Sequence, residues 1–254
     1  MTLSPSDWHH RFQIQARWTK DLRQHLYKRL DLENTRSILE VGCGTGAVLS
    51  ELRDLYRGNI YGLDVNIDYL KLAKRISRTS KLINGDAFKL PFETATFDLS
   101  TCHYLMLWLA DPLQVIIEMV RVTRPGGWIL AMAEPDYGGR IDYPYELSQI
   151  GFWQAEILTR QGADPQIGRK LSSLYYQAGL EAIESGVLGG QWSGPPAQEE
   201  LENEWTTILN DLDQLPDIVV NFEELKGLDY SAWESGERIL YVPTFYAIGK
   251  VPLS

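Results

Sequence analysis

Three alternating glycines carry the clearest chemical signal in the sequence. Residues 38–46 read Ile-Leu-Glu-Val-Gly-Cys-Gly-Thr-Gly, so a short apolar run ends in Gly42, Gly44 and Gly46. Glycine has no Cβ and adopts positive φ readily, which lets a ligand approach the backbone closely. A helical segment begins at Ala47, and its free N–H groups and positive dipole end point toward the same place. The pattern predicts a ligand-binding turn, and Gly42-x-Gly44-x-x-Ala47 also fits the relaxed dinucleotide-binding motif.

Alternating strand-like and helix-like segments must position this turn. Alternation of this kind predicts parallel strands joined by right-handed crossovers, which is a doubly wound, Rossmann-like α/β sheet. The strands are expected at Ser37–Val41, Ile60–Leu63, Lys81–Ile83, Phe97–Cys102 and Trp128–Ala133, with helices at about 45–57, 67–78 and 112–123.

Further segments flank this core on both sides. Apolar residues at helical spacing between Ser6 and Leu32 predict one or two helices ahead of the sheet. The residues from Glu134 to Tyr143 are rich in turn formers and predict a loop. Beyond this loop we expect helices at 145–161 and 167–178, a strand at Ala182–Leu188, helical residues at 198–234 with a break at Pro216, and a last strand at Arg238–Ile248.

Composition limits the classes of partner. The chain has 254 residues, 44% of them hydrophobic and 23% charged, which suits a single α/β domain over residues 1–254. No apolar run is long enough to span a bilayer, and residues 1–10 are too polar for a signal peptide. The formal charge of −10 would repel nucleic acid and anionic membrane surfaces. We therefore expect a cytoplasmic protein that binds neither nucleic acid nor membranes.

The two cysteines permit two interpretations. Without an export signal, Cys43 and Cys102 are expected to be free thiols in a reducing compartment. Both follow strands that should be neighbours, so a redox switch is conceivable. The alternative is that they are small apolar residues that fill the core.

Polar residues recur where successive strands end. Asp64 ends the second strand, Gly85-Asp86-Ala87 follows the third, and His103-Tyr104 follows the fourth. Phe97-Asp98 begins the fourth strand, and Arg124-Pro-Gly-Gly127 is expected to be a turn into the fifth. An open α/β sheet binds its ligands at the carboxyl ends of the strands. An acid at the second strand can accept hydrogen bonds from two ribose hydroxyls.

This ordered set resembles the class I S-adenosylmethionine-dependent methyltransferases of the broad small-molecule type. The resemblance covers residues 36–134 well and the remainder more loosely. It implies a mostly parallel seven-stranded sheet with an antiparallel last strand. It also implies an N-terminal helical lid over residues 1–35, and substrate-side helical insertions within 135–254. The residues that carry it are Glu40-Val-Gly-Cys-Gly-Thr-Gly46, Asp64, Gly85-Asp86-Ala87, Phe97-Asp98 and Arg124-Pro-Gly-Gly127.

The resemblance also implies where S-adenosylmethionine binds. The glycine turn should hold the amino acid part, with Glu40 supporting the turn or receiving the methionine amino group. Asp64 should bind the ribose, and Asp86 the adenine amino group. The implied cofactor-binding residues are Glu40, Gly42, Cys43, Gly44, Gly46, Asp64, Val65, Asp86, Ala87 and His103.

Several of these residues have a structural alternative. Glu40 can cap the glycine turn, Asp86 can cap a turn or helix, and His103 can be a satisfied core histidine. Asp64 is harder to explain without a ligand, because an acid at a buried strand end needs a partner. Asp98 lies at the opposite end of its strand and is expected to be structural.

The methyl acceptor is expected beside the loop after the fifth strand and under the N-terminal helices. Arg140 can bind a substrate carboxylate with its guanidinium fork, or it can pair with Asp136 or Asp142 within the loop. The N-terminal aromatic residues can form a lid, or they can simply pack an amphipathic helix. The candidate substrate-binding residues are Trp8, Phe12, Trp18, Tyr104, Tyr137 and Arg140.

No fixed catalytic residue is evident. Many relatives in the resembled family have two histidines where this chain has Leu107 and Trp108, so the acid–base role of those histidines does not carry over. The candidates for proton transfer are His103, Tyr137 and Tyr143. Two other functions stay open on the sequence alone, namely a nicotinamide-dependent oxidoreductase and a non-catalytic module that binds S-adenosylmethionine. No metal site is expected.

Overall fold

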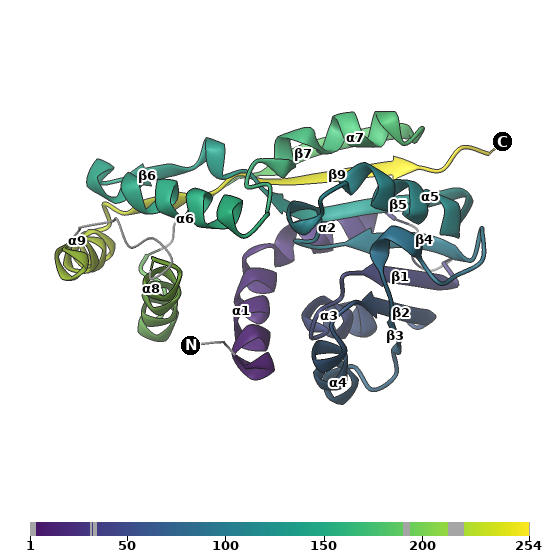
Figure 1. The fold of residues 1–254 in the computed structure, drawn as a ribbon, viewed down its shortest axis with the longest axis horizontal. Coiled ribbons are helices and arrows are strands. Elements are labelled where there is room, and N and C mark those ends of the chain that lie inside the picture. The colour runs from purple at the N-terminus through teal and green to yellow at the C-terminus, as the bar shows by residue number, and fades with distance from the viewer. Residues whose placement is uncertain (1–3, 31, 33–34, 190–193, 213–220, 254) are drawn as a thin grey trace.

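A seven-stranded sheet forms the centre of the molecule (Figure 1). The computed structural model describes residues 4–30, 32, 35–189, 194–212 and 221–253. The strand order is β3-β2-β1-β4-β5-β9-β7, and β9 runs antiparallel to both β5 and β7. This confirms the predicted doubly wound sheet with an antiparallel last strand. Its strands are β1 (Ser37–Val41), β2 (Asn59–Asp64), β3 (Lys81–Asn84), β4 (Phe97–Cys102), β5 (Thr123–Pro135), β7 (Glu181–Leu188) and β9 (Thr244–Lys250).

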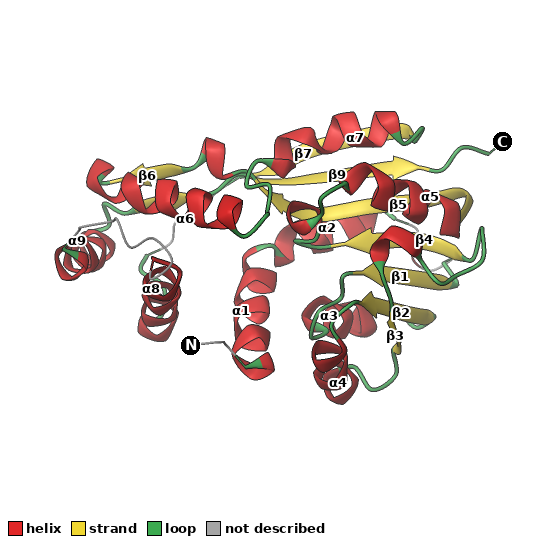
Figure 2. Ribbon diagram, viewed as in Figure 1, coloured by secondary structure: helices red, strands yellow, loops and turns green. Residues whose placement is uncertain are grey.

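Helices cover both faces of the sheet (Figure 2). One apolar cluster joins α2, α3 and α4 to one face, and a second joins α5 and α7 to the other. The parallel strands are therefore buried on both sides, as crossover connections require. The bounds are α2 (Lys20–Arg29), α3 (Ala47–Leu55), α4 (Ile67–Ile76), α5 (Pro112–Val122) and α7 (Leu171–Gln177).

The N-terminal helical region, predicted as one or two helices, consists of two. The first, α1 (Pro5–Trp18), begins with a capping box between Ser4 and Asp7 and is separated from α2 by Thr19. Thr19 is buried, and its hydroxyl donates to a carbonyl of the preceding turn. Helix α1 lies beside α3 and α4, at the carboxyl ends of the strands.

The fifth strand is longer than predicted at both ends. It includes residues 124–127, which we expected to be a turn, and the start of the expected loop at Glu134. The register moves from Phe97↔Thr123 to Leu99↔Trp128, so the strand bulges there. A Cβ on Gly127 would lie 2.8 Å from the carbonyl oxygen of Asp98, which explains why glycine is needed at this bulge.

The expected last strand is divided into two. Its first part, β8 (Ile239–Tyr241), pairs with β6 (Ile141–Tyr143) in a separate two-stranded sheet, and only β9 joins the main sheet. Pro243 lies between them, and a proline cannot donate to a strand ladder. The predicted loop from Glu134 to Tyr143 therefore contains a short strand at its end.

A smaller lobe lies beyond β6 and β8. A third apolar cluster, which includes Leu147, Trp205 and Leu225, joins its helices, and Figure 1 places them at the far end from β3. The predicted break at Pro216 falls outside the described residues. The division of the chain into one domain with a lid and insertions stays a prediction. The helices of the lobe are α6 (Ser148–Arg160), α8 (Gln198–Leu212) and α9 (Phe222–Ser235).

Candidate functional site

The glycine turn is shaped as the sequence predicts. Gly42, Gly44 and Gly46 have φ of +70°, +50° and +82°. These left-handed conformations strongly favour glycine. The amides of Gly42 and Cys43 both donate to the carbonyl of Leu63, at 2.8 and 3.0 Å, which fastens the turn to β2. The N-terminus of α3 consequently opens toward the carboxyl ends of β1, β2 and β4.

Asp64 joins the end of β2 to the glycine turn. Its Oδ2 accepts from the amide of Gly44 at 2.7 Å, and its Oδ1 accepts from the amide of Asn66 at 2.8 Å. Burial raises the pKa of this carboxyl. Each carboxylate oxygen can accept a second hydrogen bond, so Asp64 can hold the turn and a ligand hydroxyl together. The adjacent Val65 side chain is 76% exposed, an apolar surface beside the acid.

The end of β3 carries Asp86 and Ala87. Asp86 Oδ1 accepts from the amide of Phe88 at 2.9 Å, so the carboxylate caps the short 3₁₀ turn Ala87–Lys89. This capping is the structural alternative for Asp86, and a role in adenine binding stays a prediction. Asn84, which the sequence analysis did not single out, donates to the carbonyls of Asp64 and Val65 at 3.0 and 2.8 Å. A side-chain amide at a strand end was the available signal for this contact.

Glu40 is a buried carboxyl whose hydrogen bonding is incomplete. It is 2% exposed, and its Oε2 has no hydrogen-bond partner among the described residues. Burial raises the pKa of Glu40 to about 8. An unpartnered buried carboxyl beneath a ligand-binding turn fits the ammonium group of an amino acid, which would supply the missing donor.

Helix α1 lies on top of the glycine turn. The Nδ1 atom of His9 is 2.7 Å from Oγ1 of the buried Thr45. The ring of Phe12 comes within 3.2 Å of the position that a Cβ on Gly44 would occupy. Phe12 also contacts the ring of Trp8, at a centroid distance of 5.6 Å. The structure therefore brings Trp8 and Phe12 to the turn, and it adds His9 and Thr45, which the sequence analysis did not identify.

His103 faces the N-terminal helices from the end of β4. Its Nε2 is 2.8 Å from Thr19 Oγ1 and 3.4 Å from Arg23 Nη1. Burial, with the nearby Arg23 charge, lowers the pKa of His103 well below its ordinary value, so the imidazole is neutral. The ring of Tyr104 contacts His103 at a centroid distance of 4.9 Å. Burial raises the pKa of Tyr104, and the nearby Tyr137 raises it further. His103, Tyr104 and Tyr137 thus lie together beside the turn.

Two predicted residues lie at the surface. Trp18 is 58% exposed at the end of α1, and Tyr143 is 55% exposed on β6. The structure does not gather their side chains with His103 and Tyr137. Their proposed roles in substrate binding and proton transfer stay predictions.

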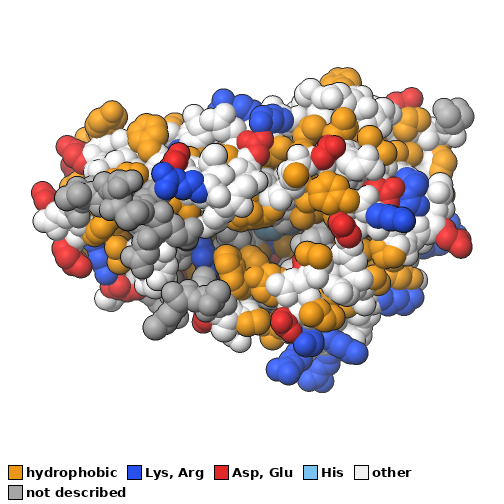
Figure 3. All heavy atoms as spheres, in the orientation of Figure 1, with side chains coloured by type: hydrophobic (Ala, Val, Ile, Leu, Met, Phe, Trp, Pro, Cys, Tyr) orange, Lys and Arg blue, Asp and Glu red, His pale blue; other side chains and the backbone are white. Residues whose placement is uncertain are grey.

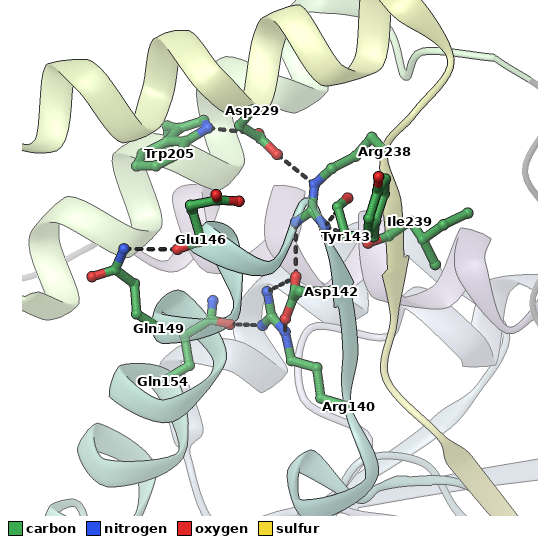
Figure 4. Close-up of polar contacts among 10 residues, drawn as sticks. All are labelled: Arg140, Asp142, Tyr143, Glu146, Gln149, Gln154, Trp205, Asp229, Arg238 and Ile239. Atoms are coloured by element: carbon green, nitrogen blue, oxygen red, sulfur yellow. Dashed lines mark hydrogen bonds and ion pairs between the residues drawn. The ribbon is translucent and has the colours of Figure 1, made fainter.

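Arg140 is paired within the protein. Its Nε and Nη2 donate to the two carboxylate oxygens of Asp142, at 2.6 and 3.1 Å, and its Nη1 contacts Gln154 (Figure 4). Asp136, the other partner expected, instead binds Arg169 at 2.5 and 2.7 Å. The structure therefore shows the ion-pair alternative for Arg140, and its binding of a substrate carboxylate stays a prediction.

Glu134 is a second buried carboxyl at the strand ends. It is fully buried and accepts from the amides of Leu105 and Met106 at 3.0 and 3.1 Å, and from that of Leu107 at 3.3 Å. Burial raises the pKa of Glu134 to about 7. These bonds hold the turn at Met106–Trp108, and sequence reasoning located Glu134 without recognising this function.

The cysteines are free and buried in different apolar clusters. Cys43 packs with the helices on one face of the sheet and Cys102 with those on the other. Burial raises the pKa of both thiols, so neither is activated as a thiolate. The structure supports their role as core residues.

The described residues contain neither a metal-binding cluster nor a membrane-spanning helix. Within the described residues there is no group of three or more His, Cys, Asp and Glu side chains that could hold a metal ion. None of the helices described is long and apolar enough to cross a bilayer.

The chain is similar to known methyltransferases in sequence and in fold. Residues 39–131 match a family described as "Methyltransferase domain". A demethylmenaquinone methyltransferase of Lysinibacillus sphaericus is 28% identical over 190 residues, which are 68% of this chain and 80% of the relative. An uncharacterized methyltransferase of Schizosaccharomyces pombe is 28% identical over 153 residues, 55% of each chain. The chain spans about half the length of that protein and of a Streptomyces fradiae protein, of which 45% is covered.

Solved structures share the fold at low sequence identity. A chain from a complex that contains the Haloferax volcanii Trm112 methyltransferase activator aligns with a TM-score of 0.63 at 18% identity, over 99% of both chains. Geranyl diphosphate C-methyltransferase from Streptomyces coelicolor aligns with a TM-score of 0.52 at 12% identity, over 85% of this chain and 72% of that one.

The seven-stranded sheet has the fold of the class I S-adenosylmethionine-dependent methyltransferases, and the matched domain belongs to the same class. Residues 39–131 of this chain are a methyltransferase domain, which confirms the resemblance drawn from the sequence. The match favours this class over the nicotinamide-dependent alternative.

Proposed function

We propose that this protein binds S-adenosylmethionine at the carboxyl ends of β1–β4 and transfers its methyl group to a small molecule. One observation carries the proposal: the buried Glu40 carboxyl, with its unpartnered Oε2, lies beneath a glycine turn that Asp64 holds in place. The Glu40 carboxyl needs a cationic donor, and the Asp64 carboxylate can accept hydrogen bonds from hydroxyls. A nucleoside joined to an amino acid carries both an ammonium group and ribose hydroxyls.

The residues of the rim would divide the cofactor among them. Glu40 would receive the ammonium group, the backbone of Gly42–Gly46 would surround the amino acid part, and Asp64 would bind the ribose hydroxyls. Val65, exposed next to Asp64, would cover the adenine, and Asp86 would accept from the adenine amino group.

When bound, the cofactor supplies a methyl group on a positively charged sulfur. The acceptor must be aligned with the methyl group and the sulfur, and such alignment can contribute about 7–11 kcal/mol. His103 Nε2 faces Thr19 and Arg23 of the N-terminal helices, and the ring of Tyr104 packs against the His103 ring. The neutral imidazole of His103 is the best-placed candidate to take a proton from an acceptor that carries one.

The overall charge supports a small acceptor. The chain carries a formal charge of −10, and on the face drawn in Figure 3 acidic and basic side chains are interspersed. A polyanion would find no broad basic surface there. Relatives named for acting on demethylmenaquinone and on geranyl diphosphate give further support. The two free thiols support the cytoplasmic location expected from the sequence.

Calorimetric titration with S-adenosylhomocysteine, the demethylated product, tests the cofactor assignment. Asp64→Ala should weaken binding by about 1–3 kcal/mol, because ribose hydroxyls lose their acceptor. Asp68→Ala, which removes an exposed acid paired with Lys71, is the matched control and should bind as the parent does. Equal affinity of Asp64→Ala and the parent would refute the ribose site. Tight cofactor binding with no turnover of any acceptor would instead favour a non-catalytic module.

A further inference from the structure

Three residues from different elements bring buried, unpartnered polar atoms to the region below the glycine turn. Arg23 Nε on α2, Glu40 Oε2 on β1 and Glu51 Oε1 on α3 have no hydrogen-bond partner among the described residues. Their charges interact, since Arg23 and Glu51 both act on the ionisation of Glu40. A buried polar atom without a partner is destabilising, so three of them in one region indicate a missing ligand.

Arg23 is held in place through its two Nη atoms, and its Nη1 also lies 3.4 Å from His103 Nε2. Its side chain is 1% exposed, its Nη2 pairs with Glu51 Oε2, and its Nη1 donates to Thr19 Oγ1 at 2.5 Å. The Nε donor is unused. A guanidinium that is anchored through its Nη atoms is fixed in orientation and can offer its remaining donor to an anion.

An α-amino acid end group matches these vacant atoms in charge. It carries one ammonium and one carboxylate on the same carbon, whereas the protein offers one vacant carboxylate oxygen, on Glu40, and one vacant guanidinium donor, on Arg23. A direct Arg23–Glu40 ion pair would satisfy both atoms, but the structure does not form one.

We propose that Arg23, from the N-terminal helices, binds the α-carboxylate of the cofactor while Glu40 receives its α-ammonium. The inference rests on the proposed function and extends it, because it assigns a residue outside the matched methyltransferase domain to the cofactor site. Glu51 and Thr19 act as positioning residues for Arg23.

Two cofactors that differ by one group test this assignment on the full chain. S-adenosylmethionine and its decarboxylated form both carry the ammonium, and only the first carries the carboxylate. By calorimetry, the parent should bind the decarboxylated form at least about tenfold more weakly, the loss expected for one charged hydrogen bond. Arg23→Gln should weaken the binding of S-adenosylmethionine by about the same factor. Its affinity for the decarboxylated form should stay within about twofold of that of the parent.

Control variants separate a binding role from a structural one. Arg23→Lys, which keeps the charge, should restore part of the lost affinity. Arg29→Gln replaces an exposed arginine on the same helix and should leave the affinity for both compounds unchanged. Glu40→Gln should weaken both compounds equally, because both keep the ammonium.

The outcomes are distinguishable. If the parent binds both compounds equally, or if Arg23→Gln weakens both alike, the assignment of Arg23 is overturned. The comparison made with the parent alone needs no variant to fold. If neither compound binds the parent at millimolar concentration, the proposed function itself is overturned.

Discussion

Burial determines the chemistry of two glutamates at the carboxyl ends of the strands, Glu40 and Glu134. Burial raises the pKa of both carboxyl groups. It does so for Glu40, which has an unpartnered oxygen, and also for Glu134, although three backbone amides donate to Glu134. Backbone amides can stabilise a buried carboxylate only in part when water is excluded. Both groups consequently retain protons at pH values at which an exposed glutamate is fully ionised.

This difference predicts that the cofactor-free protein loses stability as pH rises. In the unfolded chain these glutamates ionise near 4.5, whereas in the folded protein their pKa values are about 8 for Glu40 and about 7 for Glu134. Between those values the folded state binds more protons, so the free energy of unfolding should fall from about pH 5 to pH 8. The slope is at most about 1.4 kcal/mol per pH unit for each group.

Urea unfolding across this pH range measures the effect. Glu40→Gln and Glu134→Gln should each flatten the profile, while Glu93→Gln, an exposed glutamate, should leave it unchanged. A profile that is flat in the parent would contradict the raised pKa values.

Helix α1 is the element that contacts the glycine turn from the N-terminal side. Its contacts with the turn are the His9–Thr45 hydrogen bond and the packing of Phe12 over Gly44. Phe12 also meets Tyr69 of α4 edge-on, at a centroid distance of 5.8 Å. We therefore expect α1 to cover the proposed cofactor site and the packing of Phe12 to slow the release of a bound cofactor.

Removal of the Phe12 ring should speed cofactor release. Phe12→Ala deletes most of the apolar contact between α1 and the turn, and we expect S-adenosylhomocysteine to dissociate about tenfold faster, in line with a loss of about 1.4 kcal/mol. Stopped-flow displacement measures the rate through tryptophan emission. Gln13→Ala, an exposed neighbour on the same helix, is the control. An unchanged dissociation rate in Phe12→Ala would show that α1 does not limit release.

On the scale of the whole molecule, one buried ion network attaches the C-terminal strands to the small lobe. Arg238 lies between Asp142 of β6, at 2.9 Å, and Asp229 of α9, at 2.6 Å (Figure 4). Asp229 in turn accepts from the indole N–H of Trp205 on α8 at 2.9 Å. The charged side chains are at most 9% exposed. The network thus joins three elements that are distant in sequence.

Loss of the central charge should destabilise the protein strongly. Arg238→Met leaves two buried carboxylates without their shared partner, and we expect the free energy of unfolding to fall by about 3–5 kcal/mol. Arg160→Ala, which removes a half-exposed arginine paired along α6, should change it by less than about 0.5 kcal/mol. Urea unfolding followed by circular dichroism compares the two. A loss below about 1 kcal/mol in Arg238→Met would mean that the network contributes little.

The parts of this protein that depend on local pattern were predictable. The positive φ of Gly42, Gly44 and Gly46 follows from residue type, and the alternation of segments gives parallel strands. Because parallel strands end at one edge, Asp64 and Asp86 were expected to lie at the same rim, and their strands do end there. Boundaries were less accurate where one residue interrupts an apolar run, as Pro243 does between β8 and β9.

The sequence by itself therefore determined the parallel strands and the glycine turn, because both depend on short-range periodicity and residue type. The class of ligand followed from the resemblance that the ordered motifs carry. Only the tertiary structure decided which partner each charge has. It paired Arg140 with Asp142 and not Asp136, placed Phe12 over Gly44, and buried Arg23 beside Glu51. These choices depend on contacts between residues distant in the chain, and spacing along the sequence carries no information about which of several equivalent partners comes within reach.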